Sequence, residues 1–364
     1  MRTPAKYNDI AIVIAFPDNW AKGEKWRDRL LRALNITYTQ YYKVGHAALL
    51  LINKQNGDIE YFDYGRYIAP KGSGRVRSKN TDPKLSIPIK ARIDERGDIA
   101  NLFEIMSFLE SIRDDTHGHG KTYFSVCKNI DFYTGKQYIN RLIDGGSIKY
   151  VTYGKGGMNC SSFVSRTVIK ASGDRKTRMR LRFPQTLAPT PLGNVVNASE
   201  NGRIWEMSEG VFTPLQMSRK KVLREMLQNI LLSLWKNRHL EPGINHFIPD
   251  NHHTKVTIPD KAQLLSCLGE SAWMHIYKNV HCGENEFVIE SFTEHRKLNY
   301  SIIAKTQRYP FDLTRPYRFD YECNRLVTTI LQNGKKITFR LCRENPTPTS
   351  PSRKTNINLQ TKQF

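Results

Sequence analysis

The sequence predicts an α+β fold: an antiparallel sheet with helices in the first half of the chain, followed by a mixed, strand-rich C-terminal domain. The apolar run 44–52 and the strand formers of 59–64 flank a turn signal and indicate a hairpin. Asn333-Gly334 stands between two further strand-like runs and indicates a second hairpin. Since 364 residues suffice for two hydrophobic cores, we expect more than one domain.

The first half mixes strand and helix patterns. The apolar run 10–16 is typical of a buried strand, and apolar residues at helical spacing predict helices over 22–34, 98–112 and about 135–143. Together with the hairpin, these elements are expected to form one domain over residues 1–173.

A strand, a turn at the glycines of 154–157 and a helix are predicted to follow one another within residues 148–171. Asn159 is a good N-cap, and an apolar stripe follows it at helical spacing. Cys160 therefore falls in the first turn of the helix.

Composition changes after the first domain. Residues 174–212 are basic, then rich in Pro and Asn, and are expected to form a linker or an extended crossover. A helical pattern over 215–235 and strand-rich sequence beyond it predict a second domain over 213–344, a helix plus β-strands. The Pro- and Ser-containing tail 345–364 is expected to be disordered.

The chain is strongly basic, with a formal charge of +22 from 56 Lys and Arg against 34 Asp and Glu. This balance favours a polyanion as partner but does not say which one. Two dense clusters lie at 71–79 and 175–182. The candidate anion-binding residues within them are Arg75, Arg77, Arg178 and Arg180. The alternative is that both clusters are solvated loop surface.

No apolar stretch approaches the roughly 18–20 residues of a membrane span. The run 10–16 is too short for a signal peptide and lacks a cleavage site, so we expect a cytoplasmic protein. The six cysteines are scattered without CxxC spacing, which argues against a disulfide framework and a zinc ribbon. We therefore expect free thiols, no metal and no cofactor.

Cys160 is the candidate nucleophile. A thiol attacks only as a thiolate, and both a helix N-terminus and a nearby imidazole lower its pKa. Backbone N–H groups of this turn can also stabilise an oxyanion. Expected support for the site comes from Asn159, Ser161 and Tyr153. The alternative is that Cys160 is a small, buried residue of the helix with no chemical role.

His46 is the candidate base. It opens a strand whose next six residues, 47–52, are apolar, so an ionisable group stands where a buried sheet begins. A strand-edge histidine bonded to backbone is the commoner situation for such a residue. The pairing of His46 with Cys160 carries the hypothesis.

Three runs together resemble the papain-like superfamily in its circularly permuted form, as in lecithin retinol acyltransferase-like proteins and permuted NlpC-type hydrolases. They are Val44-Gly-His-Ala-Ala-Leu-Leu50, Glu60-Tyr-Phe-Asp63 and Gly157-Met-Asn-Cys-Ser-Ser-Phe-Val164, within residues 8–172. In ordinary papain-like enzymes the Cys helix precedes the His strand, whereas here it follows. The resemblance implies a permuted papain-like catalytic domain over 1–173.

A closer likeness is to a bacterial family of unassigned reaction. That family carries a Tyr-Phe-Asp-Tyr-Gly-Arg-Tyr strand and a Thr-His-Gly-x-Gly loop, here residues 61–67 and 116–120. This likeness implies relatives and no particular reaction.

Asp63 is the candidate third residue, because the superfamily places a polar residue on the strand next to the His strand, where it holds the imidazole tautomer. A turn centred on residue 56 pairs His46 with about Arg66, so Asp63 needs a bulge or an asymmetric loop to reach the ring. Arg66 itself cannot accept a hydrogen bond from imidazole. The alternatives on this strand are Tyr64 and Glu60.

His117 and His119 alternate with glycines in the loop 116–120. Such a loop can be a lid over a substrate. A turn determined by its backbone is the alternative, and a metal pair is a third.

Two classes of function follow. The first is an enzyme, a thiol hydrolase of amidase or peptidase type or an acyltransferase, that forms an acyl-thioester on Cys160 from a peptide, amide or acyl-ester substrate. The second is a catalytically silent papain-like module that binds nucleic acid or an anionic surface through its basic patches. Cys160→Ala abolishes the first activity and leaves the second unchanged.

Overall fold

The structure is a computed structural model that describes residues 7–22, 41–43, 45–118, 120–151, 156–186, 188–224, 227, 258–306 and 308–348. The chain divides into two compact units, Met1–Ile248 and Pro249–Phe364. It combines helices with antiparallel sheets, so the predicted α+β class is confirmed. Of the helix predicted over 22–34, residue 22 belongs to β2 (Trp20–Lys22), and residues 23–34 lie outside the described residues, as does most of the tail 345–364.

The first unit is built on an eight-stranded sheet with the order β10-β9-β7-β1-β4-β5-β6-β8. All neighbouring pairs in it are antiparallel. The strands are β1 Asp9–Phe16, β4 His46–Ile52, β5 Ile59–Gly65, β6 Ser73–Ser78, β7 Thr122–Ile130, β8 Ile148–Lys149, β9 Arg203–Ser208 and β10 Val211–Gln216. A separate pair joins β2 (Trp20–Lys22) to β3 (Tyr41–Lys43). β1 and β4 are central and buried on both faces, which explains their nearly continuous apolar sequences.

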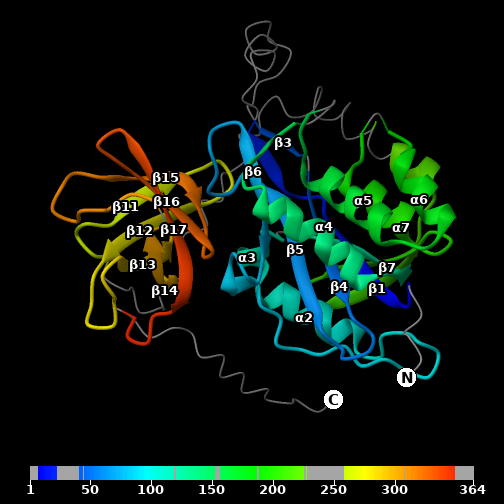
Figure 1. Cartoon of the computed structure of the whole chain (residues 1–364). Coiled ribbons are helices and arrows are strands. Elements are labelled where there is room, and N and C mark those ends of the chain that lie inside the picture. The colour runs from blue at the N-terminus through cyan, green and yellow to red at the C-terminus, as the bar shows by residue number, and fades with distance from the viewer. Residues whose placement is uncertain are drawn as a thin grey trace, which may run out of the picture. The chain divides into compact units, whose positions relative to one another are not determined.

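Helices cover both faces of this sheet (Figure 1). Along β4, Leu49 and Leu51 enter one core while Leu50 and Ile52 enter the other, as the period of two requires. The first core is covered by α4 Phe132–Asp144, α5 Cys160–Ala171, α6 Arg175–Arg182 and α7 Pro191–Ala198. The second is covered by the 3-10 helix η1 Pro83–Leu85 and by α2 Leu102–Ser111, which α3 Arg113–Thr116 follows.

The prediction that residues 174–212 form a linker is wrong. They form α6, α7, β9 and the start of β10, and β9 pairs with β7 to extend the sheet. The prolines misled because Pro191 stands at the start of α7, directly after the N-cap Thr190, where proline is favoured. The first unit therefore extends past residue 173.

The helix predicted over 215–235 begins later than expected. Residues 215–216 belong to β10, because Leu215 pairs with Ile204 of β9. Residues 219–224 are helical, and nearly all of the remaining stretch lies outside the described residues. The predicted start of the second domain at 213 thus falls inside the sheet of the first unit.

The second unit, taken by itself, holds a seven-stranded antiparallel sheet with the order β11-β12-β13-β14-β17-β16-β15. Its strands are β11 Gln263–Ser266, β12 Ser271–Tyr277, β13 Glu286–Thr293, β14 Leu298–Thr306, β15 Arg318–Cys323, β16 Val327–Gln332 and β17 Lys335–Glu344. Between β16 and β17, Asn333 and Gly334 have φ of 52° and 73°, as a tight two-residue hairpin turn requires. The predicted hairpin is confirmed.

Candidate active site

Cys160 is the first residue of α5, where the sequence places it. The side chain of the N-cap Asn159 accepts a hydrogen bond from the N–H of Ser162, and Ser162 Oγ accepts one from the N–H of Asn159, both at 2.8 Å. This reciprocal capping starts the helix directly before the thiol. Cys160 is 7% exposed and lies at the positive end of the helix dipole, which favours a thiolate.

His46 is the first residue of β4 and is 9% exposed. The preceding Gly45 has a φ of +68°, and a Cβ there would lie 3.1 Å from both the carbonyl oxygen of Phe16 and the Cα of Pro17. Glycine is the residue that fits this turn without strain, so it determines where β4 begins. The Phe16 ring stacks on the His46 ring with centroids 6.2 Å apart, which restrains the imidazole from one side.

The Cys160 thiol and the His46 ring act on each other electrostatically, and each shifts the pKa of the other. Burial disfavours the imidazolium, but the hydrogen bond to Asp63 and the nearby Cys160 outweigh it and raise the pKa of His46 from 6.5 to about 9. Burial also disfavours the thiolate, yet the His46 ring and the backbone N–H of Ala47 lower the pKa of Cys160 below its usual 9.0. These opposite shifts favour a thiolate–imidazolium pair at neutral pH.

Asp63 contacts the other side of the imidazole. Its Oδ2 lies 3.2 Å from His46 Nε2, which leaves Nδ1 for the thiol. The predicted bulge does not exist, because Ala48 pairs with Asp63, and this register puts Gly65 opposite His46 where we expected Arg66. A shift of one residue turns the Asp63 side chain to the face that carries His46, and the two meet as diagonal neighbours.

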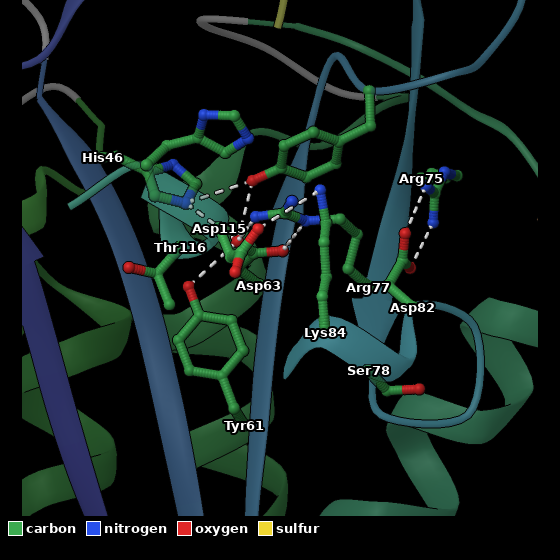
Figure 2. A network of polar contacts seen from close by, with 12 residues as sticks. His46, Tyr61, Asp63, Arg75, Arg77, Ser78, Asp82, Lys84, Asp115 and Thr116 are labelled. Atoms are coloured by element: carbon green, nitrogen blue, oxygen red, sulfur yellow. Dashed lines mark hydrogen bonds and ion pairs between the residues drawn. The ribbon is translucent and has the colours of Figure 1, made fainter. Parts of the chain in front are cut away.

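Asp63 is fully buried and is hydrogen-bonded to four side chains (Figure 2). Arg77 donates twice, from Nε to Oδ1 at 3.0 Å and from Nη2 to Oδ2 at 2.6 Å. Tyr61 and Tyr67 donate to Oδ2 at 3.0 and 2.7 Å. Burial favours the neutral acid, but the charge of Arg77 and the hydrogen bond to His46 hold the pKa of Asp63 far below its usual 3.8. Asp63 is therefore a carboxylate at any ordinary pH.

The part of the chain that holds these residues is similar to a known family. Residues 11–177 match the family model described as Type VI secretion system effector TseH-like. Residues 262–342 match a second family model, described as the DUF6695 C-terminal domain. Among solved structures, the crystal structure of Type VI secretion system effector TseH matches with 19% identity and a TM-score of 0.39, over 58% of this chain and 99% of that chain. No curated protein matches. We call residues 11–177 the TseH-like region.

Two basic residues of the TseH-like region were expected to bind anions at the surface, and this expectation is wrong. Arg75 and Arg77 lie on β6 and are 7% and 0% exposed. Arg75 donates two hydrogen bonds to Asp82, at 2.6 and 2.7 Å, and Arg77 is paired with Asp63. The cost of removing each guanidinium from water is offset by two hydrogen bonds to a carboxylate.

Arg178 and Arg180, the other two candidates for anion binding, are half-buried and bonded to helix ends. Arg178 Nη1 donates to the Ser172 carbonyl at 3.0 Å, and Arg180 Nη2 donates to the Ser199 carbonyl at 2.9 Å. Ser172 and Ser199 are the C-caps of α5 and α7, so both arginines complete helix termini. The cations that α6 exposes to solvent are Arg175, Lys176 and Arg182.

The remaining predicted site residues have different positions. Ser161 is buried, its Oγ lies 3.9 Å from the thiol, and its carbonyl accepts a hydrogen bond from Asn194 at 2.7 Å. His117 ends α3 with a φ of 54°, and its ring stacks on Tyr67 with centroids 5.5 Å apart. Tyr153 and His119 lie outside the described residues.

The two alternatives to Asp63 are engaged elsewhere. Glu60 pairs with Lys79 at 3.0 Å and with Lys136 at 2.7 Å. The hydroxyl of Tyr64 donates to the Ile148 carbonyl at 2.8 Å. Asp63 is the member of this strand that contacts the imidazole.

Sequence reasoning missed two tyrosines at the site. The Tyr67 hydroxyl lies 3.3 Å from His46 Nε2. Burial, together with the neighbouring Cys160, raises the pKa of Tyr150 well above its usual 10.0. The sequence signal for Tyr67 was its spacing. Residues 61, 63 and 65 share one face of the strand, and Tyr67 continues this spacing of two just beyond its end.

No three His, Cys, Asp or Glu side chains gather closely enough to hold a metal ion in the described ranges. Likewise, none of the helices that the structure describes is long and apolar enough to cross a membrane. All six cysteines are free thiols.

Proposed function

We propose that the TseH-like region is a thiol hydrolase of amidase or peptidase type, with Cys160 as nucleophile, His46 as base and Asp63 as the residue that orients the imidazole. The observation that carries this proposal is that Cys160 at the start of α5 and His46, held by Asp63 at 3.2 Å, shift each other's pKa in opposite directions. Where burial dominates, the pKa of a thiol rises instead, as it does for Cys127, whose pKa is raised to about 12.

The proposed reaction proceeds through an acyl-thioester. The Cys160 thiolate attacks the substrate carbonyl carbon, forming a C–S bond and an oxyanion. His46 gives its proton to the leaving amine as the C–N bond breaks. The neutral ring then takes a proton from water, whose oxygen attacks the thioester. The C–S bond breaks, the acid leaves, and the thiolate–imidazolium pair is restored.

The first turn of α5 supplies donors for the oxyanion. The capping box uses the N–H groups of Asn159 and Ser162, so we assign the N–H groups of Cys160 and Ser161 to this role. The Tyr150 hydroxyl, which is neutral and near Cys160, is a further candidate donor. With an acceptor hydroxyl or amine in place of water, the same thioester would support acyl transfer.

The match of residues 11–177 supports a biological setting for this activity. It covers β4, β5 and α5, and hence all three proposed residues. We therefore propose that the chain acts as a type VI secretion system effector whose substrate is a peptide or amide, with an acyl ester as the alternative. The silent polyanion-binding module is the weaker candidate, because Arg75 and Arg77 are buried in ion pairs.

The test uses the purified full chain, a panel of activity probes with different acyl groups, and mass spectrometry. We expect a covalent adduct on Cys160 that is lost in Cys160→Ala. Cys127→Ala is the matched control, since Cys127 is a buried thiol whose pKa is raised to about 12, and it should keep the adduct. Probe labelling or hydrolysis that survives in Cys160→Ala would contradict the proposal.

A further inference from the structure

We propose that Arg77 is a positioning residue of the Cys160–His46 pair and acts on it through Asp63. This inference rests on the proposed function, since it concerns the same site. Three adjacent strands each supply one member of a line: His46 from β4, Asp63 from β5 and Arg77 from β6. Asp63 stands directly opposite Arg77 in the register. The sheet itself therefore places Arg77 behind the carboxylate.

Arg77 determines the plane of the Asp63 carboxylate. Its two hydrogen bonds, 3.0 Å to Oδ1 and 2.6 Å to Oδ2, hold both oxygens at once. A planar guanidinium that binds in this way restricts rotation of the carboxylate, which a point charge would not do. The contact from Oδ2 to His46 Nε2, at 3.2 Å, is longer than those that Oδ2 makes to Arg77, Tyr61 and Tyr67. Asp63 is thus oriented by its other partners and presents Oδ2 to the imidazole.

The ring of Tyr67 packs on the guanidinium of Arg77 and its hydroxyl reaches Asp63 and His46. The central carbon of Arg77 lies 3.6 Å from the centroid of the Tyr67 ring, a close cation–π contact. The hydroxyl of the same tyrosine donates to Asp63 at 2.7 Å and lies 3.3 Å from His46 Nε2. One side chain therefore contacts all three members of the line and resists their separation.

Arg77 also balances the charge of the site. Charges alternate along the line: thiolate on Cys160, imidazolium on His46, carboxylate on Asp63, guanidinium on Arg77. Arg77 has the largest charge effect on Asp63, so without it the buried carboxylate would act more strongly on His46 and hold its proton more tightly. Since His46 must give that proton to the leaving group, Arg77 keeps the imidazolium acidic enough to react.

Arg77 is the cation that binds Asp63 through two direct hydrogen bonds, and other ionisable groups lie around this pair. Burial raises the pKa values of Tyr61 and Tyr67 well above 10.0, so both are neutral. Lys84 of η1 faces Asp115 of α3 at 4.0 Å (Figure 2). The remaining neighbours are the Arg75–Asp82 pair and the His117 ring behind Tyr67.

The experiment follows the pH dependence of Cys160 alkylation in the full chain. The rate with neutral iodoacetamide reports the thiolate. The ratio of iodoacetate to iodoacetamide rates reports the charge on His46, because an imidazolium attracts the anionic reagent. Arg77→Gln keeps a donor for Asp63 but removes the charge, whereas Arg77→Lys keeps the charge but removes the planar fork. Thermal unfolding of each variant shows whether it is folded.

The ratio of iodoacetate to iodoacetamide rates should fall with a midpoint near pH 9 in the wild type. In Arg77→Gln we expect this midpoint to rise by about one pH unit, which corresponds to a tenfold change in the ratio of protonated to neutral His46 at a given pH. Arg77→Lys should keep the wild-type midpoint and lower the neutral iodoacetamide rate several-fold, since Asp63 orients the ring less well. This second variant tests the inference even if Arg77→Gln fails to fold. Unchanged midpoints in folded Arg77→Gln, or an unchanged rate in Arg77→Lys, would overturn the positioning role. Failure of the proposed function looks different, since wild-type Cys160 would then react no faster than the exposed Cys342.

Discussion

Replacing His46 with glutamine tests the thiolate–imidazolium pair most directly. The amide of His46→Gln cannot take the proton of the thiol. Burial raises the pKa of Cys160, and without the ring the Ala47 N–H and the Ser161 hydroxyl remain to lower it, so we expect the pKa to return to 9.0 or above. Such a thiol is about 1% thiolate at pH 7. The wild-type pair keeps its imidazolium until the pH approaches about 9.

The thiolate population at pH 7 therefore falls by up to about 100-fold in His46→Gln. The alkylation rate falls less, on the order of tenfold, because a thiolate of lower pKa is intrinsically less nucleophilic, with a Brønsted coefficient of about 0.4–0.5. The assay is iodoacetamide alkylation of Cys160 followed by mass spectrometry across pH. The wild type should show a plateau at neutral pH, and the variant a continuous rise into the alkaline range. Coincident profiles would refute the ion pair.

The free energy of unfolding is not expected to reveal this pair. The raised pKa of His46 alone contributes stability that is complete below pH 6.5 and is lost as the pH rises through about 9. The lowered pKa of Cys160 alone contributes stability that is complete above 9.0 and is lost as the pH falls. Between pH 6.5 and pH 9.0, the native pair holds one proton, on His46, and the same two residues in the unfolded chain also hold one proton, on Cys160. The two slopes cancel, so thiol reactivity is the appropriate measurement.

Two further predictions concern supporting residues. Arg75→Gln leaves Asp82 as an unpaired buried carboxylate and should cost about 3–5 kcal/mol of unfolding free energy without changing salt-dependent retention on heparin; weaker retention than an Arg175→Gln control would restore a surface role for Arg75. Gly45→Ala should lose at least about 1 kcal/mol and slow Cys160 alkylation, because the new Cβ displaces the start of β4. Its control is Gly146→Ala, with a φ of +74° and nothing within 4 Å of the new Cβ, which should not affect the thiol.

The parts of the site that the sequence predicted carry local signals. A turn signal between two apolar runs is sufficient for the β4–β5 hairpin, and an N-cap before an apolar stripe is sufficient for the start of α5. The register predicted for the β4–β5 pair was wrong by a single residue, because the length of the turn alone does not determine how the two strands pair. That one residue decides whether Asp63 faces His46 or the opposite core, so the third member of the site could not be derived from the sequence.

Other parts depend on partners far away in the sequence. β7 is an interior strand of the sheet, yet its sequence contains Ser125 and Lys128 and resembles no buried strand. Ser125 is fully buried because its hydroxyl donates to the carbonyl of Val195 in α7, at 2.7 Å. The sequence of β7 does not show that α7 packs on it, and the sequence of α7 does not show that it packs on β7. The prolines near α7 favoured a linker instead. A local pattern cannot show that a polar residue is satisfied by a helix seventy positions later.

The basic residues show why a count of charges does not locate a binding surface. Arg77 and Arg175 contribute equally to the formal charge of +22, but Arg77 is fully buried and Arg175 is exposed on α6. The cost of burying Arg77 is offset by two hydrogen bonds to a carboxylate that itself contacts His46. Its charge therefore acts on the thiol site. A polyanion, if the chain binds one, would have to meet exposed cations such as those of α6, and neutralising these should change salt-dependent retention while leaving the reactivity of Cys160 intact.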